Sequence, residues 1–197
     1  MAAERRASVS RRTAETSVEV DLRLDGRGAA EIATGLPFLD HMLRALTVHG
    51  RFDLAVAARG DLEVDAHHTT EDVAIVLGEA FAAALGERAG IHRFGDAAAP
   101  LDESLASAAV DLAGRGHATV TLPLAGRALG TLPASLIPHF LETFALRGGV
   151  TLHLSATGRD DHHMVEAAFK ALALALRRAC APDPALAGAV PSTKGVL

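Results

Sequence analysis

The chain has 197 residues, of which 49% are apolar and 22% charged, and this composition is typical of a globular protein with a sizeable core. A net charge of −5 excludes the basic footprint of a nucleic-acid-binding protein, and no apolar run is long enough to span a membrane. The single cysteine, Cys180, excludes an intramolecular disulfide and favours a reducing compartment. No apolar segment of the signal-peptide kind follows the N-terminal arginines. We therefore expect a cytoplasmic protein with no nucleic-acid or membrane partner.

The first half of the chain predicts strands and helices in alternation. Residues 1–10 are expected to be a disordered lead-in. Alternating apolar and polar residues predict a strand over 13–24, and the glycines at 26 and 28 predict a turn before a hairpin partner over 29–34. A helix over 38–48 follows Pro37. A strand over 52–58, with a short continuation over 62–64, then leads to a long helix over 69–85.

The second half predicts a similar series. Residues 90–100 are expected to form a loop, and 105–112 and 117–122 to form strands around a glycine turn. A loop over 123–133 precedes a helix over 134–147, a strand over 150–156 and a long helix over 162–179. Pro182 and Pro184 end this last helix, and the tail over 190–197 has no hydrophobic periodicity.

The element order of residues 13–85 therefore recurs in residues 104–180. His41 and His139 take matching places in the two series, and so do the segments 67–71 and 162–166. An internal repeat of this length predicts duplicated units that stack together. We predict an α+β fold built by internal duplication of a β-sheet plus two-helix unit. Its halves are expected over 11–95 and 96–181, with a substrate-binding tail over 182–197, in one compact domain.

The matching segments carry a metal-ligand motif, His-His-x-x-Glu. If each segment starts a helix, a glutamate three or four residues after a histidine shares a face with it. Adjacent histidines diverge by roughly 100° around a helix, so each pair suits two metal ions better than one. With the upstream histidine of each half, the predicted ligands are His41, His67, His68, Glu71, His139, His162, His163 and Glu166.

The donor types restrict the metal. Imidazole suits zinc, iron, nickel or copper, and carboxylates at a high ligand count also admit Mn²⁺. No thiolate takes part, which argues against a structural zinc site. Polar residues at a helix start, capped by Asp65 or Asp160, would explain one copy of the motif. Two copies at matching places in a repeat favour a site with more than one metal ion.

Basic residues indicate an anion site. Arg93, Arg115 and Lys194 lie in predicted loops or in the tail, beside Gly, Ser or Thr. Such segments can hold an anion through backbone N–H groups and a cation. Glu15 falls within the first predicted strand, where alternation alone makes it an exposed residue.

These motifs together resemble the imidazoleglycerol-phosphate dehydratase family of histidine biosynthesis. The resemblance covers residues 11–197, without a fused phosphatase-like domain. It rests on Arg12–Thr16, Phe38–Leu43, His67–Asp72, Arg93–Gly95, Asp111–Arg115, His162–Ala167 and Pro191–Leu197.

The resemblance implies a hydro-lyase that converts D-erythro-imidazole-glycerol phosphate to imidazole-acetol phosphate. It implies two Mn²⁺ ions per active site, held by the eight ligands above. This di-manganese site would bind the substrate imidazole as imidazolate. It also implies two four-stranded sheets enclosing a helical layer, and a 24-subunit homo-oligomer with active sites at subunit interfaces.

Residue roles follow from the same resemblance. The implied catalytic residues are Glu15, as proton shuttle, with His67, Glu71 and Glu166. The implied substrate contacts are Glu15, His41, His49, His67, His68, Glu71, Arg93, Arg115, His162, His163, Lys170, Ser192, Thr193 and Lys194.

Two other functions fit the same residues. A binuclear metallohydrolase acting on a phosphorylated small molecule would also need two metal ions and basic side chains. A non-enzymatic cage protein that stores metal would also use His and Glu on alanine-rich helices. The product and the number of bound ions distinguish the three.

Overall fold

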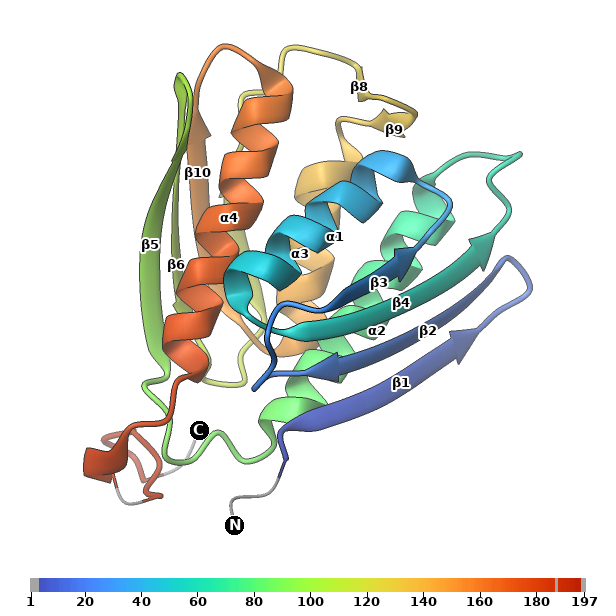
Figure 1. The fold of residues 1–197 in the computed structure, drawn as a ribbon. Helices are drawn as coiled ribbons and strands as arrows, with labels where there is room; N and C mark the ends of the chain where they lie inside the picture. Colours follow the sequence, from blue (N-terminus) through green and yellow to red (C-terminus); the bar gives the residue numbers. More distant parts are fainter. Residues whose placement is uncertain (1–3, 187, 196–197) are drawn as a thin grey trace.

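The structure, a computed structural model, describes residues 4–186 and 188–195. Two four-stranded sheets enclose a layer of helices (Figure 1). The first half contributes β1 (Arg6–Arg12), β2 (Thr16–Arg23), β3 (Ala30–Ala33), α1 (Pro37–Gly50), β4 (Asp53–Gly60) and α2 (His67–Leu85). The second half contributes β5 (Phe94–Leu101), β6 (Ser104–Asp111), β7 (His117–Thr121), β8 (Ala128–Leu129), β9 (Leu132–Pro133), α3 (Leu136–Gly148), β10 (Thr151–Thr157), α4 (Asp161–Cys180) and the 3₁₀ turn η1 (Pro184–Leu186).

The two large sheets have the same topology. Their strand orders are β1-β2-β4-β3 and β5-β6-β10-β7. In each, the last pair is parallel, because the chain returns through a crossover that contains α1 or α3. The predicted duplicated α+β fold, with two four-stranded sheets around a helical layer, is confirmed.

Two edge strands were not predicted. The expected disordered lead-in over 1–10 is wrong from Arg6 onward, because β1 pairs with β2 along its whole length. The expected loop over 90–100 is wrong from Phe94 onward, because β5 pairs with β6. Each duplicated unit therefore begins a few residues before the predicted boundaries at 11 and 96. Residues 1–3 of the lead-in and residues 187 and 196–197 of the tail lie outside the described residues.

Three smaller expectations also change. The strand β3 is not a hairpin partner of β2, because β1 and β4 occupy both edges of β2 and β3 pairs in parallel with β4. The predicted strand continuation over 62–64 is a turn. The predicted loop over 123–133 contains the short β8–β9 hairpin. The other predicted strands and the four long helices are present within one to three residues of their expected ends.

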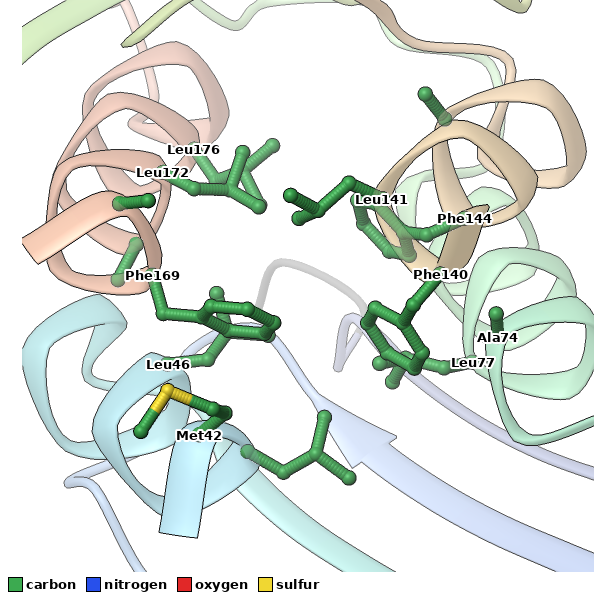
Figure 2. Close-up of a cluster of buried hydrophobic side chains, with 14 of the residues drawn as sticks. Met42, Leu46, Ala74, Leu77, Phe140, Leu141, Phe144, Phe169, Leu172 and Leu176 are labelled. Carbon is green, nitrogen blue, oxygen red and sulfur yellow. The ribbon is translucent and has the colours of Figure 1, made fainter. Parts of the chain in front are cut away.

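The helices pack across the duplication. α1 contacts α4, and α2 contacts α3, so each helix pair joins one half to the other. Their apolar side chains meet in one core, where Phe140 of α3 lies 5.9 Å from Phe169 of α4 between ring centres (Figure 2). Gly78 permits the close approach of α2 and α3, because a Cβ there would lie 2.8 Å from the Phe144 carbonyl oxygen. Among the described residues, no helix combines the length and apolar character needed to cross a bilayer.

Candidate active site

Both His-His segments lie in the first turn of a helix. Asp160 caps α4 by accepting a hydrogen bond from the His163 backbone N–H at 3.1 Å. Asp65 accepts one from the His67 backbone N–H at 2.7 Å. Asp160 is therefore a helix cap, as expected, whereas Asp65 is not, because the N-cap of α2 is Ala66 and Asp65 lies one residue before it. Because these hydrogen bonds involve only aspartate oxygens and backbone N–H groups, the histidine side chains remain free for other partners.

The first metal-ligand cluster, cluster A, consists of His41, His162 and Glu166. The Nε2 atoms of His41 and His162 lie 3.0 Å and 3.3 Å from the same Glu166 oxygen, Oε2. The His162 ring also packs edge-on against Phe38, with ring centres 5.3 Å apart. One atom from each member lies within 4.8 Å of the others, a spacing that one metal ion can bridge.

The second metal-ligand cluster, cluster B, consists of His67, Glu71 and His139. The rings of His67 and His139 are stacked with centres 5.0 Å apart. The Nε2 atoms of His67 and His139 lie 3.9 Å and 3.6 Å from the two Glu71 oxygens. His139 Nε2 is fully buried and has no hydrogen-bond partner among the described residues. A buried polar atom of this kind is costly unless a ligand completes it.

Helix pairing explains why each cluster draws on both halves. His41 on α1 reaches the start of α4, and His139 on α3 reaches the start of α2, because these are the helix pairs in contact. Spacing left open whether the halves meet within one chain or across an interface, and the family resemblance favoured an interface. For these six residues they meet within one chain.

The remaining two predicted ligands, His68 and His163, turn away from the clusters. Each ring is nearly perpendicular to the ring of the preceding histidine, with angles of 88° and 90°. His68 Nδ1 donates to Asp61 at 3.0 Å, and His163 Nδ1 donates to Glu103 at 2.9 Å. These carboxylates raise the pKa of both imidazoles. Neighbouring histidines therefore have different partners, as expected for side chains that diverge around a helix.

Cluster A carries an additional positive charge. Lys170 Nζ lies 2.7 Å from Glu166 Oε1, one helical turn away. Burial raises the pKa of Glu166, but hydrogen bonds from Lys170 and His41 outweigh it and lower that pKa to about 2. Burial and the charge of Lys170 lower the pKa of His49, which lies in the last turn of α1. The expected substrate contacts His49 and Lys170 thus lie beside this cluster.

Glu15 lies in the turn between β1 and β2, which corrects its predicted place in a strand. Thr13 Oγ1 shapes this turn by accepting hydrogen bonds from the backbone N–H groups of Glu15 and Thr16. The turn brings Glu15 Oε2 to 3.7 Å from His68 Nδ1. Its side chain is 54% exposed, so the carboxylate has room to approach a ligand.

The predicted anion site forms a pocket of about 840 Å³ at the other end of the molecule. Arg93 is held by Asp111 at 2.7 Å and 3.0 Å and by the Pro191 carbonyl at 2.6 Å, so it fastens the tail. Arg115 and Lys194 are exposed. The pocket is lined by Arg93, Phe94, Arg115, Leu186, Val190, Pro191, Ser192, Thr193 and Lys194.

The clusters and this pocket lie far apart in one chain. His162 lies in the first turn of α4, whereas the Arg93 backbone N–H donates to the Ala179 carbonyl at the other end of this helix. At 1.5 Å per residue the helix separates them by roughly 25 Å. Figure 1 shows the tail below the C-terminal end of α4, away from the helix start.

Sequence reasoning missed Asp61 and Glu103, the two carboxylates that bind the diverging histidines. Asp61 lies seven residues before His68, and Glu103 lies 60 residues before His163. Neither spacing is periodic. Both residues lie next to the end of a strand, so comparing acidic residues at strand ends in the two halves could have identified them.

Comparisons with known proteins identify the family. The family model for imidazoleglycerol-phosphate dehydratase matches residues 34–176. The imidazoleglycerol-phosphate dehydratase of Acidiphilium cryptum is 54% identical over 98% of this chain and 99% of its own length. That of Methanoculleus marisnigri is 52% identical over 98% and 100%. The crystal structure of the Pyrococcus furiosus protein has a TM-score of 0.82 at 36% identity, covering 96% of this chain and all of its own.

Proposed function

The chain belongs to the imidazoleglycerol-phosphate dehydratase family and is a dehydratase of histidine biosynthesis, and from this premise we propose that it works through a di-manganese site. Its substrate is D-erythro-imidazole-glycerol phosphate, which it binds as the imidazolate. The product is imidazole-acetol phosphate. The lone buried cysteine, Cys180, supports a reducing, cytoplasmic location.

The observation that carries the metal proposal is the unpartnered Nε2 atom of His139. This atom is buried beside Glu71 and His67 without a hydrogen bond in the described residues, so the donor set of cluster B suits a cation. Cluster A offers the same three donors, two imidazoles and one carboxylate, within the same 4.8 Å limit. Two imidazoles and one carboxylate leave open positions for further ligands, as catalytic sites require. Imidazole and carboxylate donors together admit Mn²⁺.

When bound, the ions supply Lewis acidity that favours the imidazolate form of the substrate ring. Cluster A, with His41, His162 and Glu166, and cluster B, with His67, Glu71 and His139, would hold them. An imidazolate can expel the hydroxyl on the adjacent carbon, and loss of a proton from the next carbon gives an enol that tautomerises to the ketone. The chain must therefore orient the ring and move one proton.

Glu15 is the proposed proton shuttle. It lies 3.7 Å from His68 Nδ1, yet belongs to neither cluster, so its carboxylate is not used as a ligand there. Its exposure of 54% leaves it accessible to a substrate bound beside the clusters. A positioned carboxylate can take a proton from carbon and return it to oxygen.

The tail pocket is the proposed phosphate site. Arg115 and Lys194 supply cations, and Ser192 and Thr193 supply hydroxyl groups beside them. The Lys194 backbone N–H donates to Ser192 Oγ at 3.2 Å, which shapes this segment. Arg93 contributes by holding the tail in place through the Pro191 carbonyl. Phosphate binding here would fix the substrate at the end remote from its ring.

The separation of the two regions supports sites shared between subunits. The substrate is roughly 10 Å long, judging from bond lengths near 1.5 Å, and cannot span roughly 25 Å within one chain. A ring held by the metal clusters of one subunit therefore needs a phosphate pocket from another. This agrees with the proposed homo-oligomer of 24 subunits, in which His68 and His163 would complete metal sites across interfaces.

The test is to incubate Mn²⁺-loaded protein with imidazole-glycerol phosphate and identify the product. The proposal predicts imidazole-acetol phosphate without release of inorganic phosphate. Release of inorganic phosphate would instead indicate a metallohydrolase. An inert substrate combined with many ions per chain would indicate a metal-storing cage.

A further inference from the structure

The carboxylates that bind His68 and His163 come from different places in the two halves. Asp61 follows Gly60 in the loop between β4 and α2. Arg159 follows Gly158 at the corresponding point before α4, so this position carries no carboxylate, and the neighbouring Asp160 is used as the helix cap. The histidine of the second half instead receives Glu103, which comes from the turn between β5 and β6.

Glu103 and Glu15 hold equivalent positions in the duplication. Glu15 directly precedes Thr16, the first residue of β2, and Glu103 directly precedes Ser104, the first residue of β6. Their distances to histidine differ, because Glu103 lies 2.9 Å from its imidazole whereas Glu15 lies 3.7 Å from its own. In the first half Asp61 occupies the nearer position, at 3.0 Å.

We propose that Asp61 and Glu103 are positioning residues that fix His68 and His163 in the Nδ1–H tautomer and present Nε2 outward as a metal ligand. Because Asp61 accepts the hydrogen bond from His68 Nδ1, Glu15 stays free for proton transfer. Glu103 is not free in this way, because it accepts the hydrogen bond from His163 itself. This inference rests on the proposed function in one respect only, the metal that Nε2 would bind. A carboxylate on the second nitrogen is the usual partner of a metal-binding histidine.

The surroundings of the two carboxylates fit these roles. Glu103 Oε1 accepts hydrogen bonds from the backbone N–H groups of Arg159 and Asp160, at 3.2 Å and 3.0 Å, so it is anchored to the start of α4. An anchored carboxylate holds an imidazole well but transfers protons poorly. Asp61 is 19% exposed, and both of its oxygens face His68 Nδ1 at 3.2 Å and 3.0 Å.

The first test measures Mn²⁺ affinity in the full-length protein. Asp61→Ala should weaken binding by about 10- to 100-fold, whereas Asp61→Asn should bind nearly as wild type, because its amide oxygen still accepts from Nδ1. Glu63→Gln, in the same loop and exposed, is the matched control and should change nothing. At saturating Mn²⁺ the Asp61→Ala protein should regain its bound metal but only part of its turnover, because His68 Nδ1 is then free to bind Glu15. Wild-type affinity in Asp61→Ala, or equal weakening in Asp61→Asn, would overturn the proposal.

The second test separates this inference from the proposed function. Nuclear magnetic resonance of ¹⁵N-labelled histidines in metal-free, full-length protein reads the tautomers directly, with His68 assigned through His68→Gln. We expect Nδ1–H at His68 and His163, and loss of that preference at His68 alone in Asp61→Ala. An Nε2–H tautomer at His68 in the wild type would refute the positioning role. A wild-type protein that bound no Mn²⁺ would refute the di-manganese function instead.

Discussion

The two halves of the molecule agree at one end and differ at the other. At the starts of α2 and α4, each half helps to build a cluster of two histidines and one glutamate. The agreement is not complete, because Lys170 neutralises Glu166 whereas Ile75 follows Glu71 at the same spacing. Two similar clusters suit a reaction that needs two metal ions, and the added charge makes them chemically unequal.

The opposite end shows how duplication was adapted. Arg5 and Arg93 hold equivalent positions in the two halves. The Arg5 carbonyl accepts a hydrogen bond from the Leu24 N–H, and the Arg93 carbonyl accepts one from the Leu112 N–H. Arg93 holds the tail and lines the pocket, whereas Arg5 is paired with Asp25 and the Cys180 carbonyl. A substrate with one phosphate needs one such pocket. This matches the structure, in which the arginine of the second half lines a pocket and that of the first half is paired.

The largest predicted effect comes from the cluster glutamates. Glu71→Gln and Glu166→Gln should each lower turnover by more than about 10³-fold, because an ion contributes several kcal/mol to charge stabilisation. Steady-state kinetics with imidazole-glycerol phosphate measures this, with Glu142→Gln on the exposed face of α3 as control. If one of the two variants kept full activity, the reaction would not need both clusters.

The next largest effect is expected from Glu15, the proposed proton shuttle. Glu15→Gln should lower kcat by about 10²- to 10⁴-fold with bound Mn²⁺ unchanged, because only proton transfer is lost. Glu19→Gln, exposed on the neighbouring strand, serves as control. Single-turnover kinetics measures the rate of the chemical step, and elemental analysis measures the bound Mn²⁺. Near-wild-type turnover in Glu15→Gln would remove it as the shuttle.

The basic ends offer a matched pair of arginines. Arg115→Ala should raise KM by about 10- to 100-fold with little change in kcat, because one charge-assisted hydrogen bond to phosphate contributes about 1.5–3 kcal/mol. Arg27, exposed four residues after the end of β2, is its first-half equivalent, and Arg27→Ala should leave KM unchanged. Equal effects of the two changes would contradict a single phosphate pocket.

The smallest effect concerns Arg5 and Asp25, the ion pair of the first half. A hydrogen bond from Arg5 lowers the pKa of Asp25 below its ordinary value of 3.8. A carboxyl group with a lowered folded pKa adds stability above that value and loses it as pH falls through the folded pKa. Asp25→Asn should therefore reduce the free energy of unfolding at neutral pH by less than about 1 kcal/mol. Urea unfolding should show this difference vanish in strong acid, with KM unaffected.

The sequence predicted the duplicated plan because its helices and central strands have strong periodic patterns. β2, for example, alternates buried and more exposed residues along its whole length. The edge strands lack that signal. β5 is rich in alanine and contains Gly95 and Pro100, which are poor strand formers, and it is a strand because β6 and α4 pair and pack against it.

The proposed metal ligands were identified because the same short motif recurs in both halves. Their grouping into clusters A and B was not predictable, since it depends on which helices pack together. Asp61 and Glu103 were missed because they are equivalent in role but not in position. Glu15 was recognised only through the family resemblance, and its place in a turn depends on β1, which itself went unpredicted.

The most direct test counts Mn²⁺ ions bound per chain as cluster glutamates are removed one at a time. The account predicts two ions in the wild type, one in Glu71→Gln, one in Glu166→Gln and none in the double variant. Elemental analysis of the full-length proteins after removal of excess metal gives these numbers. A single variant that kept both ions, or lost both, would contradict the account that each cluster holds its own ion.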